Sequence, residues 1–233
     1  EHKIFPKFAD DISTYMARVL MGTTDVVMDH QEKKKLQKKF ISPDLCDITE
    51  QLVYTEPYND ERGRNNVYAP NAEFVKEKLY EDEELHLEVA KLKMDFMTRA
   101  QSLIHGDLHT GSIFINEEST IVFDPEFCMY GPMGYDIGNV IANMIFAWCN
   151  GDAAGAGEFC SWVESVLRDV VNLTMDKMGR YYDEHITDTM CKSKGFKEWY
   201  MKTILEDTSA VTGLELIRRI VGMANVKDIS TMA

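Results

Sequence analysis

The amino-acid sequence predicts a mainly helical α+β domain in which one small β-hairpin is set among the helices. Most of the 233 residues fall in segments whose apolar side chains recur every three or four positions, the period of an amphipathic helix. Residues 102–123 depart from this period and contain short β-type runs around a polar turn. With 45% apolar residues, the chain can bury a sizeable core.

The first part of the chain is predicted to form surface helices followed by a loop. Apolar side chains at helical spacing indicate one helix at 8–20 and a second at 29–40. We expect the lysine-rich run 33–39 of the second helix to face solvent. Pro43 indicates the first turn of a third helix, because proline fits that position. The polar stretch 56–70 contains two prolines and a glycine and is expected to be a loop.

The remaining helices follow from the same apolar period. Where the spacing repeats at i, i+3, i+4 and i+7, the repeat indicates helices packed on a core. The predicted segments are 71 to about 103 with a break at 80–84, one after Gly134 that includes 137–148, one that includes 159–170, one at 194–206 and one at 214–224.

The β-hairpin brings two acidic segments together. Strands are predicted at 112–115 and 120–123, with a polar turn between them. Asp107 lies just before the first strand and Asp124 just after the second. Because a hairpin reverses the chain, we expect both carboxylates to face one site.

These acidic residues suit phosphoryl transfer. That reaction needs one carboxylate to orient or deprotonate the attacking hydroxyl and others to hold the Mg²⁺ that neutralises the triphosphate of ATP. Asp107, in His105-Gly-Asp-Leu-His-Thr-Gly-Ser112, suits the first role, and Asp124 and Glu126 suit the second. If Asp124-Pro125-Glu126 is extended, its two carboxylates point to the same side. Either motif alone is common in turns, but the combination indicates an ATP-dependent kinase.

The two motifs resemble the catalytic and metal loops of the choline kinase and aminoglycoside phosphotransferase group, which has the two-lobed protein-kinase-like fold. Most members of that group have asparagine where this chain has Ser112. With this serine, the loop is similar to that of the 5-methylthioribose kinase family, as are residues 124–138, 27–33 and 41–46. The resemblance covers nearly the whole chain.

The resemblance implies a reaction and a set of site residues. The family phosphorylates 5-methylthioribose at its 1-hydroxyl with Mg²⁺-ATP, a step of methionine salvage, and acts as a homodimer. Asp107 corresponds to the catalytic, substrate-binding carboxylate, and Asp124-Pro125-Glu126 to the Mg²⁺-ATP segment. Arg218 and Arg219 correspond to the paired arginines of the methylthioribose site.

The helical period places the two arginines less favourably than the resemblance does. The predicted helix has its apolar stripe at Leu214, Ile217, Ile220, Val221 and Ala224. At about 100° per residue, Arg218 falls near the edge of this stripe and Arg219 on the opposite side. Two solvent-exposed arginines would give the same pattern.

Four further residues are expected to support the catalytic loop. Asp136, at the start of a helix, can cap free N–H groups or brace the loop. His105 is expected to pack or brace, His109 to line the site, and Ser112 to end the loop. The spacing His-x-Asp-x-His also suggests a metallohydrolase, but no second histidine pair accompanies it.

The chain is expected to be one lobe of a larger enzyme. It begins at Glu1 rather than at methionine and lacks both a Gly-x-Gly-x-x-Gly loop and an N-lobe lysine segment. We therefore interpret residues 1–233 as the C-terminal catalytic lobe, without the N-terminal lobe that covers the nucleotide. Alone, it should have little or no kinase activity.

Composition excludes other classes of function. A net charge of −14 disfavours binding to nucleic acid. No membrane-length apolar run or export leader is present, so we expect a cytoplasmic protein with no membrane contact, and its five cysteines, with no C-x-x-C pair, are expected to be reduced. Two alternatives stay open: a related kinase for choline, an aminoglycoside or another sugar, and a catalytically inactive binding module.

Overall fold

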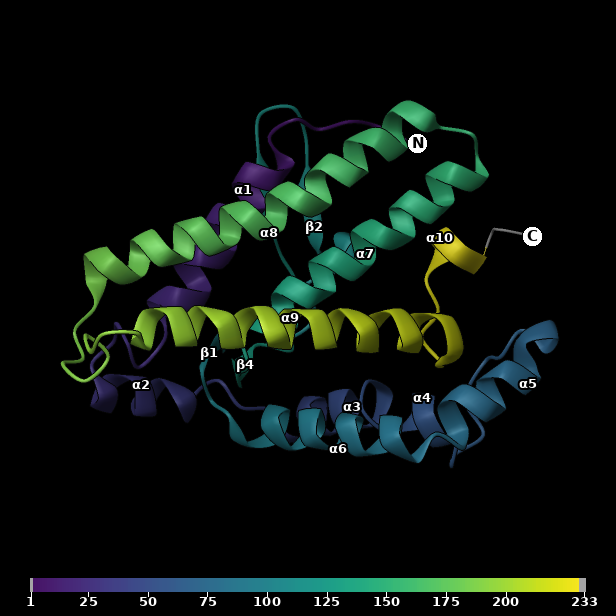
Figure 1. Ribbon diagram of the computed structural model, residues 1–233, viewed down its shortest axis with the longest axis horizontal. Helices are drawn as coiled ribbons and strands as arrows, with labels where there is room; N and C mark the ends of the chain where they lie inside the picture. Colours follow the sequence, from purple (N-terminus) through teal and green to yellow (C-terminus); the bar gives the residue numbers. More distant parts are fainter. Residues whose placement is uncertain (1, 231–233) are drawn as a thin grey trace.

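The computed structural model describes residues 2–230 and is built around one long central helix, α9 (Figure 1). Helices α7 and α8 lie on one side of α9, and helices α2 to α6 lie on the other. The elements in chain order are α1 Phe8–Met16, a π-helical turn η1 Ala17–Met21, α2 His30–Gln37, α3 Pro43–Leu52, α4 Glu56–Asn59, η2 Ala69–Asn71, α5 Ala72–Val75, η3 Lys76–Tyr80, α6 Glu83–Thr98, β1 Ser102–Ile104, η4 Thr110–Ser112, β2 Ile113–Ile115, β3 Thr120–Val122, β4 Met129–Gly131, α7 Gly134–Ala153, α8 Gly157–His185, α9 Phe196–Val221 and α10 Lys227–Ser230.

The predicted β-hairpin is confirmed, and a second strand pair accompanies it. Strands β2 and β3 are antiparallel, with Ile113 opposite Val122. Strand β1 pairs with β4, and the sequence analysis did not predict this pair. Strand β1 leads into the loop that contains Asp107, and β4 follows the acidic segment 124–126. The pairing of β1 with β4 therefore holds these two segments close to each other, in addition to the β2–β3 hairpin.

Helices α7 and α9 approach each other closely through glycines of α7. A Cβ atom at Gly134 would lie 2.6 Å from the backbone nitrogen of Thr208, and one at Gly138 would lie 2.9 Å from that of Thr212. Backbone atoms cannot move aside as a flexible side chain can. The absence of side chains at these two positions therefore sets the separation of the helices and places the end of α9 near the loop before α7.

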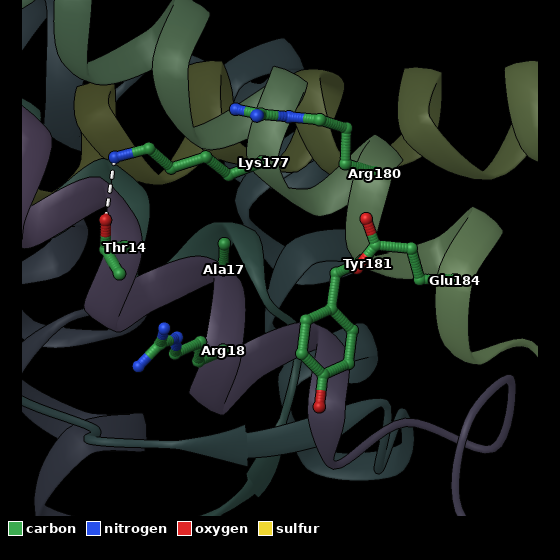
Figure 2. A pocket seen from close by; sticks show the side chains of 7 residues that line it. All are labelled: Thr14, Ala17, Arg18, Lys177, Arg180, Tyr181 and Glu184. Carbon is green, nitrogen blue, oxygen red and sulfur yellow. Dashed lines mark hydrogen bonds between the residues drawn. The ribbon is translucent and has the colours of Figure 1, made fainter.

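Helix α1 packs against α8 and is linked to it by Lys177. The ammonium group of Lys177 donates to the Thr14 hydroxyl at 2.7 Å, as Figure 2 shows, and pairs with Asp10 at 2.7 Å. A surface pocket of about 280 Å³ lies at this contact. Of its other basic residues, Arg180 is paired with Asp176. The pocket shares no lining residue with the cavity at Asp107 that is described below.

The two helices predicted at 194–206 and 214–224 are one continuous helix, α9. Polar side chains in the segment that joins the two predicted ranges have partners inside the fold. Asp207 accepts a hydrogen bond from Arg99 at 2.5 Å, and the Thr208 hydroxyl donates to the carbonyl of Ile204. A buried polar group with a partner costs little, so the helix continues through the segment.

Two expectations for the N-terminal part were wrong in part. The stretch 56–70 begins with the short helix α4, in which Pro57 lies in the first turn, where proline is tolerated, and residues 60–68 form the expected loop. Lys33 is only 1% exposed, although the rest of its run lies at or near the surface. Its ammonium donates to the carbonyls of Ala100 and Gln101 and pairs with Asp25. Lys33 thus holds the backbone that enters β1.

Two expectations from composition can be compared with the structure. Within residues 2–230, no helix combines the length and the apolar character needed to cross a membrane. All five cysteines are free thiols.

Replacing Gly134 by alanine should destabilise the fold by about 1–3 kcal/mol, because the added methyl group has no room against the backbone of Thr208. The matched control is Gly213→Ala. Gly213 lies in α9, and a Cβ atom there would meet nothing within 4 Å. That variant should be up to about 1 kcal/mol more stable, since alanine favours helix. Urea unfolding followed by tryptophan fluorescence measures both. Equal effects at the two positions would contradict the close contact of α7 and α9.

Candidate active site

The loop that contains Asp107 is held by the buried carboxylate of Asp136 in the first turn of α7. Its Oδ2 accepts from the backbone N–H of His105 at 2.7 Å, and its Oδ1 accepts from that of Gly106 at 3.0 Å. Burial raises the pKa of Asp136 to about 6, and the two hydrogen bonds act against this shift. The loop backbone is therefore tied to a core helix immediately before Asp107.

His105 and Gly106 join this loop to the acidic segment that follows β3. The buried ring of His105 has its Nε2 2.8 Å from the carbonyl oxygen of Phe123, and its Nδ1 accepts from the N–H of Asp107 at 3.4 Å. Nε2 must therefore carry the ring proton. Gly106 has φ +82°, and a Cβ there would lie 2.2 Å from the carbonyl oxygen of Phe127. Only glycine fits this approach, which packs the two loops backbone to backbone.

Asp107 lies between three cationic or hydrogen-bonding side chains. Its Oδ1 is 3.3 Å from a terminal nitrogen of Arg218 and 3.3 Å from one of Arg219. Its Oδ2 is 3.5 Å from Nε2 of His109. Burial opposes ionisation, but the His109 hydrogen bond and the arginine charges outweigh it and lower the pKa of Asp107 to about 2. Its side chain keeps 28% exposure, so it can still reach a ligand.

The two arginines share a second carboxylate, Glu215, which the sequence analysis missed. Arg219 donates from Nε to Glu215 Oε1 at 2.8 Å, and Arg218 donates from Nε to the other oxygen, Oε2. Glu215 is 1% exposed. The sequence contains one signal for these ion pairs. Arg218 and Arg219 follow Glu215 by three and four positions, which places all three side chains on neighbouring positions of a helix surface.

The apolar stripe expected on this part of α9 is confirmed at Leu214 and Val221 but is wrong at Ile220. Ile220 is 45% exposed, whereas Glu215 and Arg218 are buried beside Leu214 and Val221. Arg219 is also turned inward, with a side chain only 13% exposed. The ion pairs with Glu215 and Asp107 make the burial of these charges possible.

His109 and Ser112 complete the loop. His109 accepts at Nδ1 from the N–H of Gly111 at 2.9 Å, and the Ser112 hydroxyl donates to the carbonyl of Asp107 at 3.3 Å. The rings of His105 and His109 thus have different partners. Within the described residues 2–230, no three His, Cys, Asp or Glu side chains are grouped to hold a metal.

The segment Asp124-Pro125-Glu126 is exposed and is not extended as expected. Asp124 has φ +63°, and the N–H of Cys128 donates to the carbonyl of Pro125 at 3.0 Å, which closes a turn. Aspartate is among the residues that tolerate this backbone region. Mg²⁺ is usually held by one or two carboxylates together with phosphate and water oxygens, so Asp124 and Glu126 are donors of the right kind and number.

A cavity of about 150 Å³ opens beside Asp107. Asp107 and the two arginines line it, as do Tyr135 of α7 and Phe127 of the turn after Glu126. The apolar side chains of Ile48 and Leu52 in α3 and of Val53, the residue after it, also line the cavity. The site therefore combines charged groups with an apolar wall from a helix that the sequence analysis did not connect with function.

Replacing Asp136 by asparagine should lower the free energy of unfolding by about 1–3 kcal/mol, because the amide NH₂ would face a backbone N–H and leave it without an acceptor. Asp82→Asn is the control. Asp82 caps α6 by accepting from the N–H of Leu85, and asparagine caps equally well. Urea unfolding compares the two variants, and a loss at position 82 as large as that at 136 would contradict this assignment.

The ion pairs of Asp107 predict a pH dependence of stability. Its pKa falls from 3.8 to about 2 in the folded state, so the ionised carboxylate stabilises the fold above about pH 4, and this contribution is lost as the pH falls towards 2. The difference in unfolding free energy between wild type and Asp107→Asn should therefore shrink on acidification. Urea titrations at several pH values measure it. A difference that grows on acidification would refute the ion pairs.

Known proteins are similar to the chain over its whole length. It is 34% identical to the methylthioribose kinase of Exiguobacterium sibiricum, in an alignment that covers 100% of this chain and 58% of that protein. It is 37% identical to the methylthioribose kinases of Geobacillus kaustophilus and Bacillus cereus, covering 98% and 97% of this chain and 56% of each relative. The chain thus spans little more than half the length of these relatives.

A family model shows the wider relationship. The model described as the phosphotransferase enzyme family matches residues 39–167, which include the Asp107 loop, the β2–β3 hairpin and the acidic segment. Within the matched range, Gly106 and Asp107 of the loop, Phe127 and Tyr135 line the cavity. Because the match takes in more than half of the residues, the chain belongs to the phosphotransferase enzyme family.

Proposed function

We propose that the protein to which this chain belongs transfers the γ-phosphoryl group of ATP to the 1-hydroxyl of 5-methylthioribose, a step of methionine salvage. The observation that carries the proposal is the ionised Asp107, held by two arginines at the mouth of a cavity with an apolar wall. Relatives that are 34–37% identical over almost all of this chain are named methylthioribose kinase.

Asp107 orients the sugar hydroxyl for in-line attack. A carboxylate with a pKa of about 2 is a weak base but a reliable hydrogen-bond acceptor at neutral pH. Phosphoryl transfer has a loose transition state, so positioning contributes more than early proton removal does. Arg218 and Arg219 stabilise the negative charge that develops near the acceptor oxygen.

The apolar wall of the cavity suits the methylthio end of the substrate. Ile48, Leu52 and Val53 present hydrocarbon to the space beside the arginines. A thioether placed there would lose contact with water while the hydroxyls stay near Asp107, which favours methylthioribose over more polar sugars.

Asp124 and Glu126 form the nucleotide side of the proposed site. When bound to these carboxylates, Mg²⁺ would neutralise charge on the triphosphate. Nearby, Phe114 is 63% exposed and its ring stacks on that of Phe123 at 4.0 Å between centroids. This aromatic surface beside Asp124 can pack against a flat base. The Pro125 turn holds the segment in place.

The relatives are longer than this chain, and we assign the missing part of the proposed enzyme to the region that the chain does not span. In our proposal, residues 1–233 are the C-terminal catalytic lobe, and the part of the relatives that this chain does not span supplies the cover of the nucleotide. The lobe alone should then show little activity. By resemblance to the family, the complete enzyme is a cytoplasmic homodimer.

ADP release by the complete protein tests the proposal, with Mg²⁺-ATP and methylthioribose, choline or kanamycin offered separately. Methylthioribose alone should support turnover, and Asp107→Asn should lower kcat on the order of 10²–10⁴-fold. Asp176→Asn, at an exposed surface ion pair, is the control and should leave kcat unchanged.

The other outcomes separate the alternatives. Turnover with choline or kanamycin instead would keep the phosphotransferase and reject the substrate. No ADP release with any acceptor would favour an inactive binding module. Wild-type rates in Asp107→Asn would reject the role of this carboxylate.

A further inference from the structure

Glu215 stands out because it is an almost fully buried acidic residue that has no role in the proposed reaction described above. It lies on α9 one turn before the two arginines. Its two oxygens accept hydrogen bonds from different guanidinium groups, Oε2 from Arg218 and Oε1 from Arg219. We propose that Glu215 is the positioning residue of the site: it orients both arginines towards Asp107. This inference rests on the proposed function for its kinetic consequences.

Arg218 and Arg219 use the same kind of donor atom towards Glu215. Both arginines bind Glu215 through Nε, and both direct a terminal nitrogen to the same oxygen of Asp107, at 3.3 Å in each case. A guanidinium group is planar and rigid, so a hydrogen bond at Nε fixes the direction of its terminal nitrogens. Glu215 therefore determines where the two positive groups point, although it does not touch the substrate itself.

Arg218 and Arg219 are consecutive residues of α9. Consecutive residues of a helix project about 100° apart, so Arg218 and Arg219 would normally diverge. Two cations that converge on one carboxylate oxygen also repel each other. A buried anion between their Nε atoms offsets both effects. Without Glu215, we expect Arg219, the more exposed of the two, to turn towards solvent.

Glu215 also balances the charge of the two arginines. Glu215, Arg218, Arg219 and Asp107 form a cluster of two anions and two cations. The buried positions of Glu215 and Arg218 require such pairing, because an unpaired buried charge is strongly destabilising. The cluster keeps two cations at the site at zero net charge.

The test uses Glu215→Gln in the complete protein. The amide oxygen can accept from one arginine, but the amide NH₂ repels the other, so one guanidinium group loses its fixed direction. We expect kcat/KM for methylthioribose to fall on the order of 10²-fold, the scale of a misplaced catalytic group, while the KM for Mg²⁺-ATP stays at the wild-type value. Glu206→Gln, an exposed position of the same helix paired with Lys202, should change neither.

Glu215→Asp keeps the charge in case the glutamine variant does not fold. Its shorter side chain cannot span both Nε atoms, so kcat/KM for methylthioribose should again fall in a variant whose circular dichroism shows that it is folded. In combination with Arg219→Gln, the effect of Glu215→Gln should be smaller than in wild type, because one of the two arginines that it orients is already gone. Full activity of Glu215→Asp, or effects that simply multiply, would overturn the proposal.

A measurement without substrate separates this proposal from the proposed function. In ¹H–¹⁵N spectra, the Nε–H groups of Arg218 and Arg219 should exchange slowly with solvent in wild type, and at least one should exchange fast in Glu215→Gln. If methylthioribose is not a substrate, this loss of protection still supports the positioning role. Unchanged protection in Glu215→Gln would overturn it, whatever the acceptor.

Discussion

The two hydrogen bonds from the backbone of His105 and Gly106 to Asp136 connect the candidate site to the core. Asp136 is in the first turn of α7, and α7 is packed closely on α9 through Gly134 and Gly138. The same helix pair therefore positions both the Asp107 loop, through Asp136 of α7, and the arginines that contact Asp107, through α9. A small shift of α7 against α9 would change the distance between Asp107 and its cations.

The site is organised around charge pairing in a partly dry environment. Asp107 stays ionised because two arginines and His109 compensate for its burial, and the arginines remain buried because Glu215 shares them. Each charge depends on the next, so the cluster behaves as a unit rather than as separate salt bridges. Such a unit gives fixed cations where a phosphate ester forms, with little reorganisation during the reaction.

The acidic segment differs from the Asp107 loop in exposure. Asp124, Pro125 and Glu126 are exposed, and the left-handed backbone of Asp124 is held by the packing of Gly106 on Phe127 and by the turn at Pro125. An exposed carboxylate pair is suited to a metal ion that arrives together with its nucleotide, whereas the buried cluster is suited to a fixed acceptor site. The proposed nucleotide side of the site is therefore exposed, whereas the proposed acceptor side is largely buried.

The sequence by itself determined the helical class, the β2–β3 hairpin, and the motifs at Asp107 and Asp124, because these depend on local period and on turn chemistry. It did not determine the continuity of α9 or the burial of Lys33, Glu215 and Arg218. A helical pattern assigns charged residues to the outside, since burial of a lone charge is costly. Only the tertiary structure supplies the partners that are distant in sequence: the carbonyls of Ala100 and Gln101 for Lys33, Arg99 for Asp207, and Asp107 for Arg218 and Arg219. These partners decide which face of each helix is inside.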